Sequence, residues 1–338
     1  MKALFLDGIG KLSVQDVAQP APKPDEVLVR VEACGICGTD RHLFLGEFPS
    51  FPPVTLGHEF SGIIEAVGQD VTDMQVGMRV TSDPNIACGV CEACQAGRVN
   101  LCHNLQAIGI HRNGGFAEFV VMPRKQAFAL PLSLDPLHGA FCEPLACCLH
   151  AVDLAGLKAG ASVTVIGGGV IGLLTVQLAR LAGATRVVLV TRNRAKRDLA
   201  ARLGATACLD PAEVDEYLRQ HGGADVVFEC AGLAATVAGA PRLARRGGMV
   251  VILGVLPAGQ MVEIEPFDLL FREVSLITSF LNPFTHARAA DLIAAGAVQI
   301  APLISRTLTL DQAATVIASP APDGEIRALA VPAMTNRA

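Results

Sequence analysis

Short alternating runs of apolar and polar residues dominate the chain up to about residue 145. The runs at 26–33 (EVLVRVEA) and 59–68 (EFSGIIEAVG) carry apolar side chains at about every second position, which is the period of a strand with one buried face. Prolines cluster at 20–24 and 49–53, and the first long helical pattern appears only at 137–156. This pattern predicts a β-rich unit that ends in a helix.

From about residue 160 the pattern changes to apolar strands that alternate with helices. Strands are expected at 162–168, 186–191, 224–232 and 247–255, and the first two helices at 170–184 and 194–205. Strand–helix alternation predicts a doubly wound parallel sheet. Beyond about residue 283 the character is mixed, with a helix expected at 286–297 and a strand at 325–332.

The uncharged stretch at residues 159–179 is long enough, by length alone, to cross a bilayer. It begins, however, with alternating β-branched residues, contains three consecutive glycines at 167–169, and resumes at helical spacing. A strand, a tight turn and a helix account for that order of residues, whereas a membrane-spanning helix does not. We therefore expect no membrane partner.

Composition favours a globular protein of two domains. The chain has 338 residues, of which 51% are hydrophobic and 17% charged, so it can bury more than one ordinary core. A net charge of −5 without a basic block argues against a nucleic-acid partner. No secretory signal is evident, because Asp7 and Gly8 end the first apolar run, and the chain has 11 cysteines. Reduced or metal-bound thiols and a cytoplasmic location are expected.

The three consecutive glycines belong to the pattern Gly167-x-Gly169-x-x-Gly172, between an expected strand and an expected helix. In that position glycines allow a tight turn and let a pyrophosphate approach the N-terminus of the helix. Val170 and Ile171 open that helix, whose backbone N–H groups would face the phosphates. The pattern predicts a dinucleotide-binding site, and a glycine-rich packing turn is the alternative.

The end of the next strand bears on which dinucleotide is bound. An NAD-binding fold places a carboxylate there to accept hydrogen bonds from the ribose. This chain has Thr191, Arg192, Asn193 and Arg194 instead, with Arg197 shortly afterwards. Because guanidinium groups bind phosphate well, the segment predicts NADP in preference to NAD. A solvated, basic helix start is the alternative.

Four cysteines with the spacing Cys88-x2-Cys91-x2-Cys94-x7-Cys102 occupy one short segment. Four thiolates close a tetrahedral zinc site and leave no position for a substrate, which is the arrangement of a structural zinc. An iron–sulfur cluster is the alternative. The bacterial ferredoxin pattern, however, has a three-residue last gap followed by proline, whereas here His103 follows Cys102. The segment predicts a structural zinc site.

A second set of metal-binding residue types is spread along the β-rich part. The segment CGICGTDRH contains Cys34 and Cys37, TLGHEFSG contains His58 and Glu59, and FCEPLACCLH contains Glu143. A zinc ion with three protein ligands keeps one position open for a substrate. These residues are therefore the candidates for a catalytic metal centre.

These segments together resemble the zinc-dependent medium-chain alcohol and polyol dehydrogenases, in particular the sorbitol and arabitol dehydrogenases. GICGTD, GHEFSGIIEAVGQDV, the four-cysteine segment, GGFAEF and VIGGGVIG occur in the order typical of that family, and the resemblance covers essentially the whole chain. It implies an α/β protein with two domains. These are a β-rich GroES-like catalytic domain at 1–147 and 283–338, and a Rossmann cofactor domain with a doubly wound parallel sheet at 148–282.

The resemblance also implies roles for single residues. The expected catalytic-zinc residues are Cys37, His58, Glu59 and Glu143, and the expected proton-relay residues are Thr39 and His42. Glu143 stands where many alcohol dehydrogenases have a cysteine, so direct binding by Glu143, by Glu59 or by the adjacent Cys142 stays open. Thr39 also suits a helix N-cap, and His42 suits a surface position.

The activity implied is a zinc-dependent transfer of hydride between NADP(H) and a secondary alcohol or ketone. A polyol and its ketose are the expected substrates. Asn282 stands near the place where sorbitol dehydrogenases have an arginine, and Phe44, Phe48 and Phe284 favour an apolar wall. A simple secondary-alcohol dehydrogenase and a threonine-type dehydrogenase therefore stay open. The remote alternative is a non-catalytic zinc-binding protein.

The expected partners are a small-molecule substrate and further copies of the chain. The resemblance implies a homo-oligomer, a tetramer or else a dimer, in which the sheets of two cofactor domains pair across a two-fold axis. Residues 247–266 (GGMVVILGVLPAGQMVEIEP) are the expected edge for that pairing.

Overall fold

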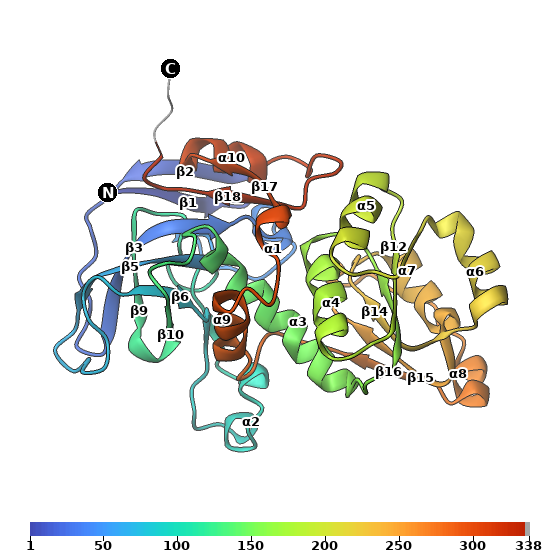
Figure 1. Cartoon of the computed structure of the whole chain (residues 1–338). Helices are drawn as coiled ribbons and strands as arrows, with labels where there is room; N and C mark the ends of the chain where they lie inside the picture. The colour runs from blue at the N-terminus through green and yellow to red at the C-terminus, as the bar shows by residue number, and fades with distance from the viewer. Residues whose placement is uncertain (335–338) are drawn as a thin grey trace. The chain divides into compact units, whose positions relative to one another are not determined.

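The chain divides between Ala146 and Cys147, and again between Asn282 and Pro283, in a computed structural model that describes residues 1–334 (Figure 1). Unit 1 comprises Met1–Ala146, Pro283–Pro322 and the described residues from Arg327 onward. Unit 2 comprises Cys147–Asn282 and Asp323–Ile326. The last four residues of the catalytic domain expected at 283–338 lie outside the described residues.

Unit 1 is built on mostly antiparallel sheets. Its seven-stranded sheet has the order β10-β6-β5-β3-β18-β17, with β9 also paired to β3, and a three-stranded sheet has the order β2-β1-β4. The strands are β1 (Lys2–Gly8), β2 (Lys11–Asp16), β3 (Glu26–Gly35), β4 (Val54–Thr55), β5 (Glu59–Val67), β6 (Arg79–Ser82), β9 (Phe119–Pro123), β10 (Ala127–Leu130), β17 (Ile304–Leu308) and β18 (Arg327–Ala330). Residues of the strands and of the segments between them supply one core, which includes Val29, Phe60 and Phe116.

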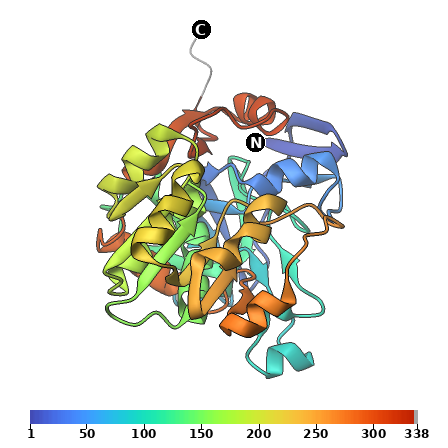
Figure 2. The same cartoon turned by 90° about the vertical axis from the view of Figure 1, so that its right-hand side faces the viewer.

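Short helices connect these strands. They are α1 (Gly38–Leu45), α2 (Glu92–Gln95), α9 (His286–Ala294) and α10 (Leu310–Ile317), with the 3-10 turns η1 (Val99–Leu101), η2 (Arg124–Gln126), η3 (His138–Phe141) and η6 (Ala301–Leu303). The longer α3 (Cys142–Ala155) runs from unit 1 into unit 2. Figures 1 and 2 both show α2 at the lower tip of a loop that projects from its unit. In the chain this loop lies between the paired short strands β7 (Asn85–Ile86) and β8 (Gln106–Ala107). That loop carries the four cysteines.

Unit 2 is a doubly wound sheet of six parallel strands in the order β13-β12-β11-β14-β15-β16. The strands are β11 (Ser162–Ile166), β12 (Arg186–Val190), β13 (Ala207–Leu209), β14 (Ala224–Glu229), β15 (Ala244–Ile252) and β16 (Ser275–Thr278). The helices are α4 (Val170–Leu181), α5 (Arg194–Arg202), η4 (Pro211–Glu213), α6 (Val214–His221), α7 (Ala234–Gly239), η5 (Ala240–Leu243) and α8 (Pro266–Arg272). The order in which successive strands are added to the sheet reverses between β11 and β14, and ligands of such folds bind at that switch point.

The α/β fold class expected from the sequence is confirmed, and the stretch 159–179 holds β11, the glycine turn and the start of α4. Among the described residues there is no helix of the length and apolarity that a bilayer crossing needs. The expectation that 247–266 forms the sheet edge is wrong, because β15 lies between β14 and β16. The apolar run of β15 is hydrogen-bonded on both sides, and the shorter β16 forms the edge.

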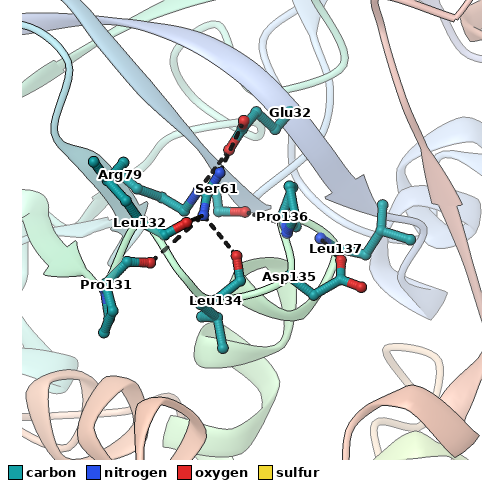
Figure 3. Close-up of polar contacts among 9 residues, drawn as sticks. All are labelled: Glu32, Ser61, Arg79, Pro131, Leu132, Leu134, Asp135, Pro136 and Leu137. Carbon is teal, nitrogen blue, oxygen red and sulfur yellow. Dashed lines mark hydrogen bonds and ion pairs between the residues drawn. The ribbon is translucent and has the colours of Figure 1, made fainter.

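A buried arginine ties the segment before α3 to the main sheet of unit 1 (Figure 3). Nε of Arg79 on β6 lies 2.8 Å from Oε2 of Glu32, and its Nη1 donates to the carbonyl oxygens of Leu132 (2.7 Å) and Leu134 (2.6 Å). Oγ of Ser61 on β5 donates to the carbonyl of Pro136 across 3.1 Å. The loop that leads into η3 and α3 is therefore held by polar contacts at several points.

We expect Arg79→Met to destabilise the protein by about 3–5 kcal/mol, because it leaves Glu32 and the carbonyl groups of Leu132 and Leu134 without their partner. Urea denaturation followed by far-UV circular dichroism measures the effect. The matched control is Arg124→Met, which breaks a pair with the more exposed Asp73 and is expected to cost at most about 1 kcal/mol. Equal effects of the two substitutions would contradict the structural role of the buried arginine.

A histidine on α9 is buried in the core of unit 1. The ring of His286 lies 4.9 Å from that of Phe128, and its Nε2 is 3.5 Å from Oγ1 of Thr81. Burial lowers the pKa of His286 to about 3. The folded protein therefore holds this imidazole neutral over a pH range in which the unfolded chain protonates it.

Acid should weaken the fold through His286. Its pKa in the unfolded chain is about 6.5, so below that pH the unfolded state binds a proton that the folded state excludes down to pH about 3. The resulting loss of stability is up to about 1.4 kcal/mol per pH unit. We expect His286→Gln to reduce the slope of the unfolding free energy between pH 6 and pH 4, measured by urea titration. An unchanged slope would contradict the assignment.

Candidate active site

Three side chains with metal-binding groups meet in unit 1. One ligand atom each from Cys37, His58 and Glu59 lies within 4.8 Å of the others. Cys37 is the N-cap of α1 shortly after β3, while His58 and Glu59 lie at the start of β5, which pairs with β3 so that Gly35 is opposite Glu59. A Cβ atom on Gly35 would lie 2.3 Å from Oε2 of Glu59. Glycine at this position therefore makes room for the carboxylate.

Buried charged groups surround this cluster. Nη2 of Arg327 on β18 lies 3.1 Å from Oε1 of Glu59, and both side chains are almost inaccessible. Oδ2 of Asp40 accepts a 2.7 Å hydrogen bond from the backbone N–H of Cys37, while its Oδ1 lies 3.7 Å from Nδ1 of His58. Two buried carboxylates thus face one guanidinium, so the cluster attracts a further positive charge.

The pKa of His58 reflects the same imbalance. Burial by itself would lower this pKa, but the hydrogen bond with Cys37 and the negative charges of Asp40 and Glu143 raise it well above the ordinary value. Burial raises the pKa of Asp40, against the lowering effect of His58. Groups that stabilise a proton on a buried imidazole also stabilise a divalent cation that replaces the proton.

The donor set fits zinc. A thiolate, an imidazole and carboxylates are the usual ligands of zinc in proteins. Oδ1 of Asp40, Nδ1 of His58 and Nε of Arg327 are buried without a hydrogen-bond partner within the described part of the chain. A histidine that binds a metal through one ring nitrogen usually turns the other toward a carboxylate, and Asp40 occupies that place.

Glu143 lies beside the group of three and not within it. It is the second residue of α3, its exposed fraction is 7%, and its charge acts on His58. The adjacent Cys142 is buried next to Thr81, and burial raises the pKa of its thiol to about 12. Since zinc binds the thiolate, Glu143 is the better candidate of the two for a ligand from α3.

The two expected relay residues lie on α1. Sγ of Cys37 donates to Oγ1 of Thr39 across 3.6 Å. The N-cap of α1 is Cys37, and Thr39 lies inside the helix, so the alternative that Thr39 is the N-cap is wrong. His42 follows one turn later with a side chain that is 27% exposed. Both residues therefore lie on the helix that starts at a candidate ligand.

The phenylalanines expected to line an apolar wall do not share one environment. Phe44 and Phe48 are partly buried and pack against the core of unit 1. Phe284 is 72% exposed and has a positive φ of 58°. Asn282 is almost fully buried. Packing in the core of unit 1 therefore accounts for two of the three aromatic residues without a substrate.

The four cysteines of the α2 loop form a second compact group. One sulfur atom each from Cys88, Cys91, Cys94 and Cys102 lies within 4.8 Å of the others. Backbone N–H groups point at these atoms, with Cys88 donating to Sγ of Cys102 across 3.2 Å. The N–H groups of Cys94 and His103 lower the pKa of Cys91 to about 6. Burial raises the pKa of Cys94 in the same group to about 12. Four sulfur atoms this close together fit a closed zinc site.

The glycine turn of unit 2 lines a pocket of ≈ 530 Å³ at the carboxyl ends of β11, β12 and β14. Gly167 has a φ of 107°, and a Cβ atom on Gly172 would lie 1.9 Å from the carbonyl oxygen of Gly167. No atom lies within 4 Å of a Cβ built on Gly169, the N-cap of α4, whose first turn is Val170 and Ile171. The turn is therefore tightly packed between Gly167 and Gly172, and it is open at Gly169, where a pyrophosphate would approach.

The residues after β12 divide into two groups. Thr191 and Arg192 line the pocket. Asn193 caps α5 through its side chain, and Arg194 is the first residue of that helix. Nη1 of Arg197 donates to the carbonyl oxygens of Thr191 (2.6 Å) and Arg192 (2.8 Å). Arg197 therefore holds the shape of the turn, and Arg192 is the arginine of this segment that lines the pocket.

Sequence reasoning missed several residues of these sites. Asp40 had a local signal, because it stands three residues after the N-cap of α1, where a side chain caps the helix start. Arg327 and Arg242 had none, since they lie far along the chain from their neighbours in the structure. Arg242 of η5 lines the same pocket as Arg192. Glu229 is buried at the end of β14 and accepts hydrogen bonds from the loop that follows it.

Comparisons with known proteins agree with this geometry. The family “Alcohol dehydrogenase GroES-like domain” matches residues 23–132, and “Zinc-binding dehydrogenase” matches residues 170–295. A sorbitol dehydrogenase from Halalkalibacterium halodurans is 34% identical over 82% of this chain and 84% of that protein. An L-threonine 3-dehydrogenase from Bacillus subtilis is 33% identical over 92% of this chain and 93% of that protein.

A solved structure is closer still in sequence. It is a zinc-binding dehydrogenase from Sinorhizobium meliloti 1021 bound to NADP, which is 62% identical, covers 98% of this chain and 99% of its own, and superposes with a TM-score of 0.96. The chain therefore belongs to the zinc-type alcohol dehydrogenase family. It is an enzyme that oxidises alcohols, as the resemblance in the sequence predicted.

We expect Asp40→Asn to weaken the metal site of Cys37 and His58 about 10–100-fold, because the charge that faces Nδ1 of His58 is lost. Competition with a chelator, followed by elemental analysis, measures the affinity. The four-cysteine loop of the same molecule is the internal control and should keep its zinc. Asp73→Asn, at an exposed carboxylate, is the matched control variant. Unchanged affinity in Asp40→Asn would contradict the assigned role.

Proposed function

We propose that this protein oxidises a secondary alcohol to a ketone with NADP⁺, and catalyses the reverse reduction, with a polyol as the favoured alcohol. The observation that carries this proposal is the convergence of Cys37, His58 and Glu59 in a buried, negatively charged cluster. A closed structural site would not require the buried charges of Asp40 and Arg327 beside it. Thiolate, imidazole and carboxylate donors around one position suit a catalytic zinc.

The proposed metal residues are Cys37, His58 and Glu143, with Glu59 near enough to share the site, and Cys88, Cys91, Cys94 and Cys102 for the structural zinc. Zinc at the first site supplies a positive charge that lowers the pKa of an alcohol hydroxyl. Thr39 lies against the sulfur of Cys37, so its hydroxyl is placed to accept the proton of the substrate. His42, on the same helix and partly exposed, is placed to pass a proton to water.

NADP is the proposed cofactor. Gly167, Gly169 and Gly172 shape a turn that leaves room for a pyrophosphate, and Val170 and Ile171 begin the helix behind it. At the end of β12 the pocket is lined by Thr191 and Arg192 and carries no carboxylate at that strand end. An arginine at this place suits the 2′-phosphate of NADP. The relative from Sinorhizobium meliloti, itself bound to NADP, supports the same choice.

The substrate class rests on the relatives. Sorbitol dehydrogenases are among the proteins similar to this chain, which supports a polyol. L-threonine 3-dehydrogenases are similar to nearly the same degree, which supports an amino alcohol as the second candidate. In both classes the oxidised carbon carries a secondary hydroxyl group, so the metal residues and the relay residues would serve either substrate.

Domain roles and assembly complete the proposal. We assign catalysis to 1–147 and 283–338 and cofactor binding to 148–282.

We further propose a homo-oligomer, in which the edge strand β16 pairs with its copy. The exposed apolar residues Phe267, Leu270 and Phe271 of α8, just before that edge, support such burial. None of the 11 cysteines, all of which lie among the described residues, forms a disulfide, which supports a reducing, cytoplasmic compartment.

Cofactor titration tests this function without a substrate. We expect NADPH to bind at least tenfold more tightly than NADH, a difference in binding free energy of about 1.4 kcal/mol. The fluorescence of the reduced nicotinamide measures the binding of each cofactor. Arg192→Gln should remove most of that preference and leave the affinity for NADH unchanged. The control is Arg219→Gln, at an exposed arginine of α6 paired with Glu216. Binding of neither cofactor would refute the proposed function, and tighter binding of NADH would refute the cofactor choice.

A further inference from the structure

A carboxylate contacts the expected relay histidine at the end of α1. Oε2 of Glu47 lies 2.6 Å from Nδ1 of His42, and both side chains are partly exposed, at 38% and 27%. A contact this short between a carboxylate and an imidazole needs an explanation from the fold.

The C-terminus of α1 places Glu47 over His42. Gly46 has a φ of 77°, its N–H donates to the carbonyl of Leu43 (3.2 Å), and the N–H of Glu47 donates to the carbonyl of His42 (2.8 Å). These paired bonds define a Schellman cap, which turns the chain back over the last helical turn. The positive φ of Gly46 favours glycine at this turn. The backbone thus holds Glu47 at this position.

The other charged groups of α1 face elsewhere. Arg41 donates to the carbonyl oxygens of Val316 and Ser319 at the end of α10, the helix that packs against α1. Asp40 is fully buried and contacts the backbone of Cys37 and the ring of His58. The segment around Ile9 and Gly10 meets α1 through an apolar side chain and a backbone N–H group. Glu47 is therefore the charged group paired with His42 in the described structure.

We propose that Glu47 is a positioning residue of the proton path: it accepts a hydrogen bond from Nδ1–H of His42 and thereby keeps Nε2 unprotonated and oriented to receive the proton released on alcohol oxidation. The inference rests on the relay role assigned to His42 under the proposed function. A histidine in the neutral form carries one ring proton, and the partner of one nitrogen decides the state of the other. The proton taken up by Nε2 leaves to water, so His42 returns to the same tautomer.

An exposed ion pair with no function is the competing explanation. Such pairs contribute little to stability, so thermal stability barely separates the two explanations. The tautomer of His42 and the rate of proton release do separate them, because a functionless pair has no reason to govern either.

The experiment compares Glu47→Leu and Glu47→Gln with wild type in the full-length, zinc-loaded protein. Nitrogen-15 spectra of labelled histidine report which ring nitrogen of His42 carries the proton, and His42→Gln assigns the signal. We expect Nδ1–H in wild type, a shift to Nε2–H in Glu47→Leu, and retention of Nδ1–H in Glu47→Gln, whose side-chain oxygen still accepts the bond. The same tautomer in wild type and Glu47→Leu would overturn the proposal.

Kinetics with NADP⁺ complete the test, using the fastest of sorbitol, 2,3-butanediol and threonine. We expect kcat to fall about 10-fold in Glu47→Leu, with KM and the affinity for NADPH unchanged. Added imidazole buffer, as an external base, should restore the rate. Glu216→Leu, which removes an exposed carboxylate paired with Arg219, is the control.

The outcomes distinguish this inference from the proposed function. An unchanged kcat in Glu47→Leu, with a slow His42→Gln, would overturn the role of Glu47 and leave the relay intact. Unchanged rates in both variants would overturn the relay and this inference with it. A slow Glu47→Leu that imidazole does not restore would make Glu47 a structural residue and overturn the proposal. Wild type without activity on any alcohol would refute the proposed function itself.

Discussion

Burial of charge constrains unit 1 more than any other interaction. Asp40, Glu59 and Arg327 lie almost completely out of contact with water, beside Cys37 and His58. Removing such groups from water costs several kcal/mol each unless they are paired or bind a metal. Pairing requires β3, β5 and β18 to meet in one register, because each strand or its flanking turn supplies part of the cluster. The geometry of the candidate metal site and the stability of the sheet therefore depend on the same strand register.

In unit 2 the candidate binding site is formed mainly by backbone groups and not by buried charges. The turn after β11 has glycine, and so no side chain, at Gly169, where a phosphate would approach. Because Gly172 also lacks a side chain, helix α4 packs directly against the turn. Charge enters only at the rim, where Arg192 and Arg242 line the pocket.

Much of this arrangement could be predicted from the sequence because its signals are local. The four cysteines fall within one segment, the three glycines within six residues, and strand and helix periods are read over short windows. Fold class, family and the residue types of both metal sites follow from such patterns. The edge of the sheet did not, because only the pairing of β15 with both β14 and β16 places β15 in the interior and β16 at the edge.

The sequence by itself determined the class of the protein, its glycine turn and its cysteine group, since neighbours in the chain are necessarily neighbours in space. The tertiary structure alone decided the contacts between distant residues. Arg327 pairs with Glu59, and Arg242 joins Arg192 in one pocket, because strands and helices far apart in the chain converge there. Even the nearby pair of His42 and Glu47 needed the structure, since it depends on the left-handed turn at Gly46. A side chain's partner is set by where the backbone places it, and that is a property of the whole fold.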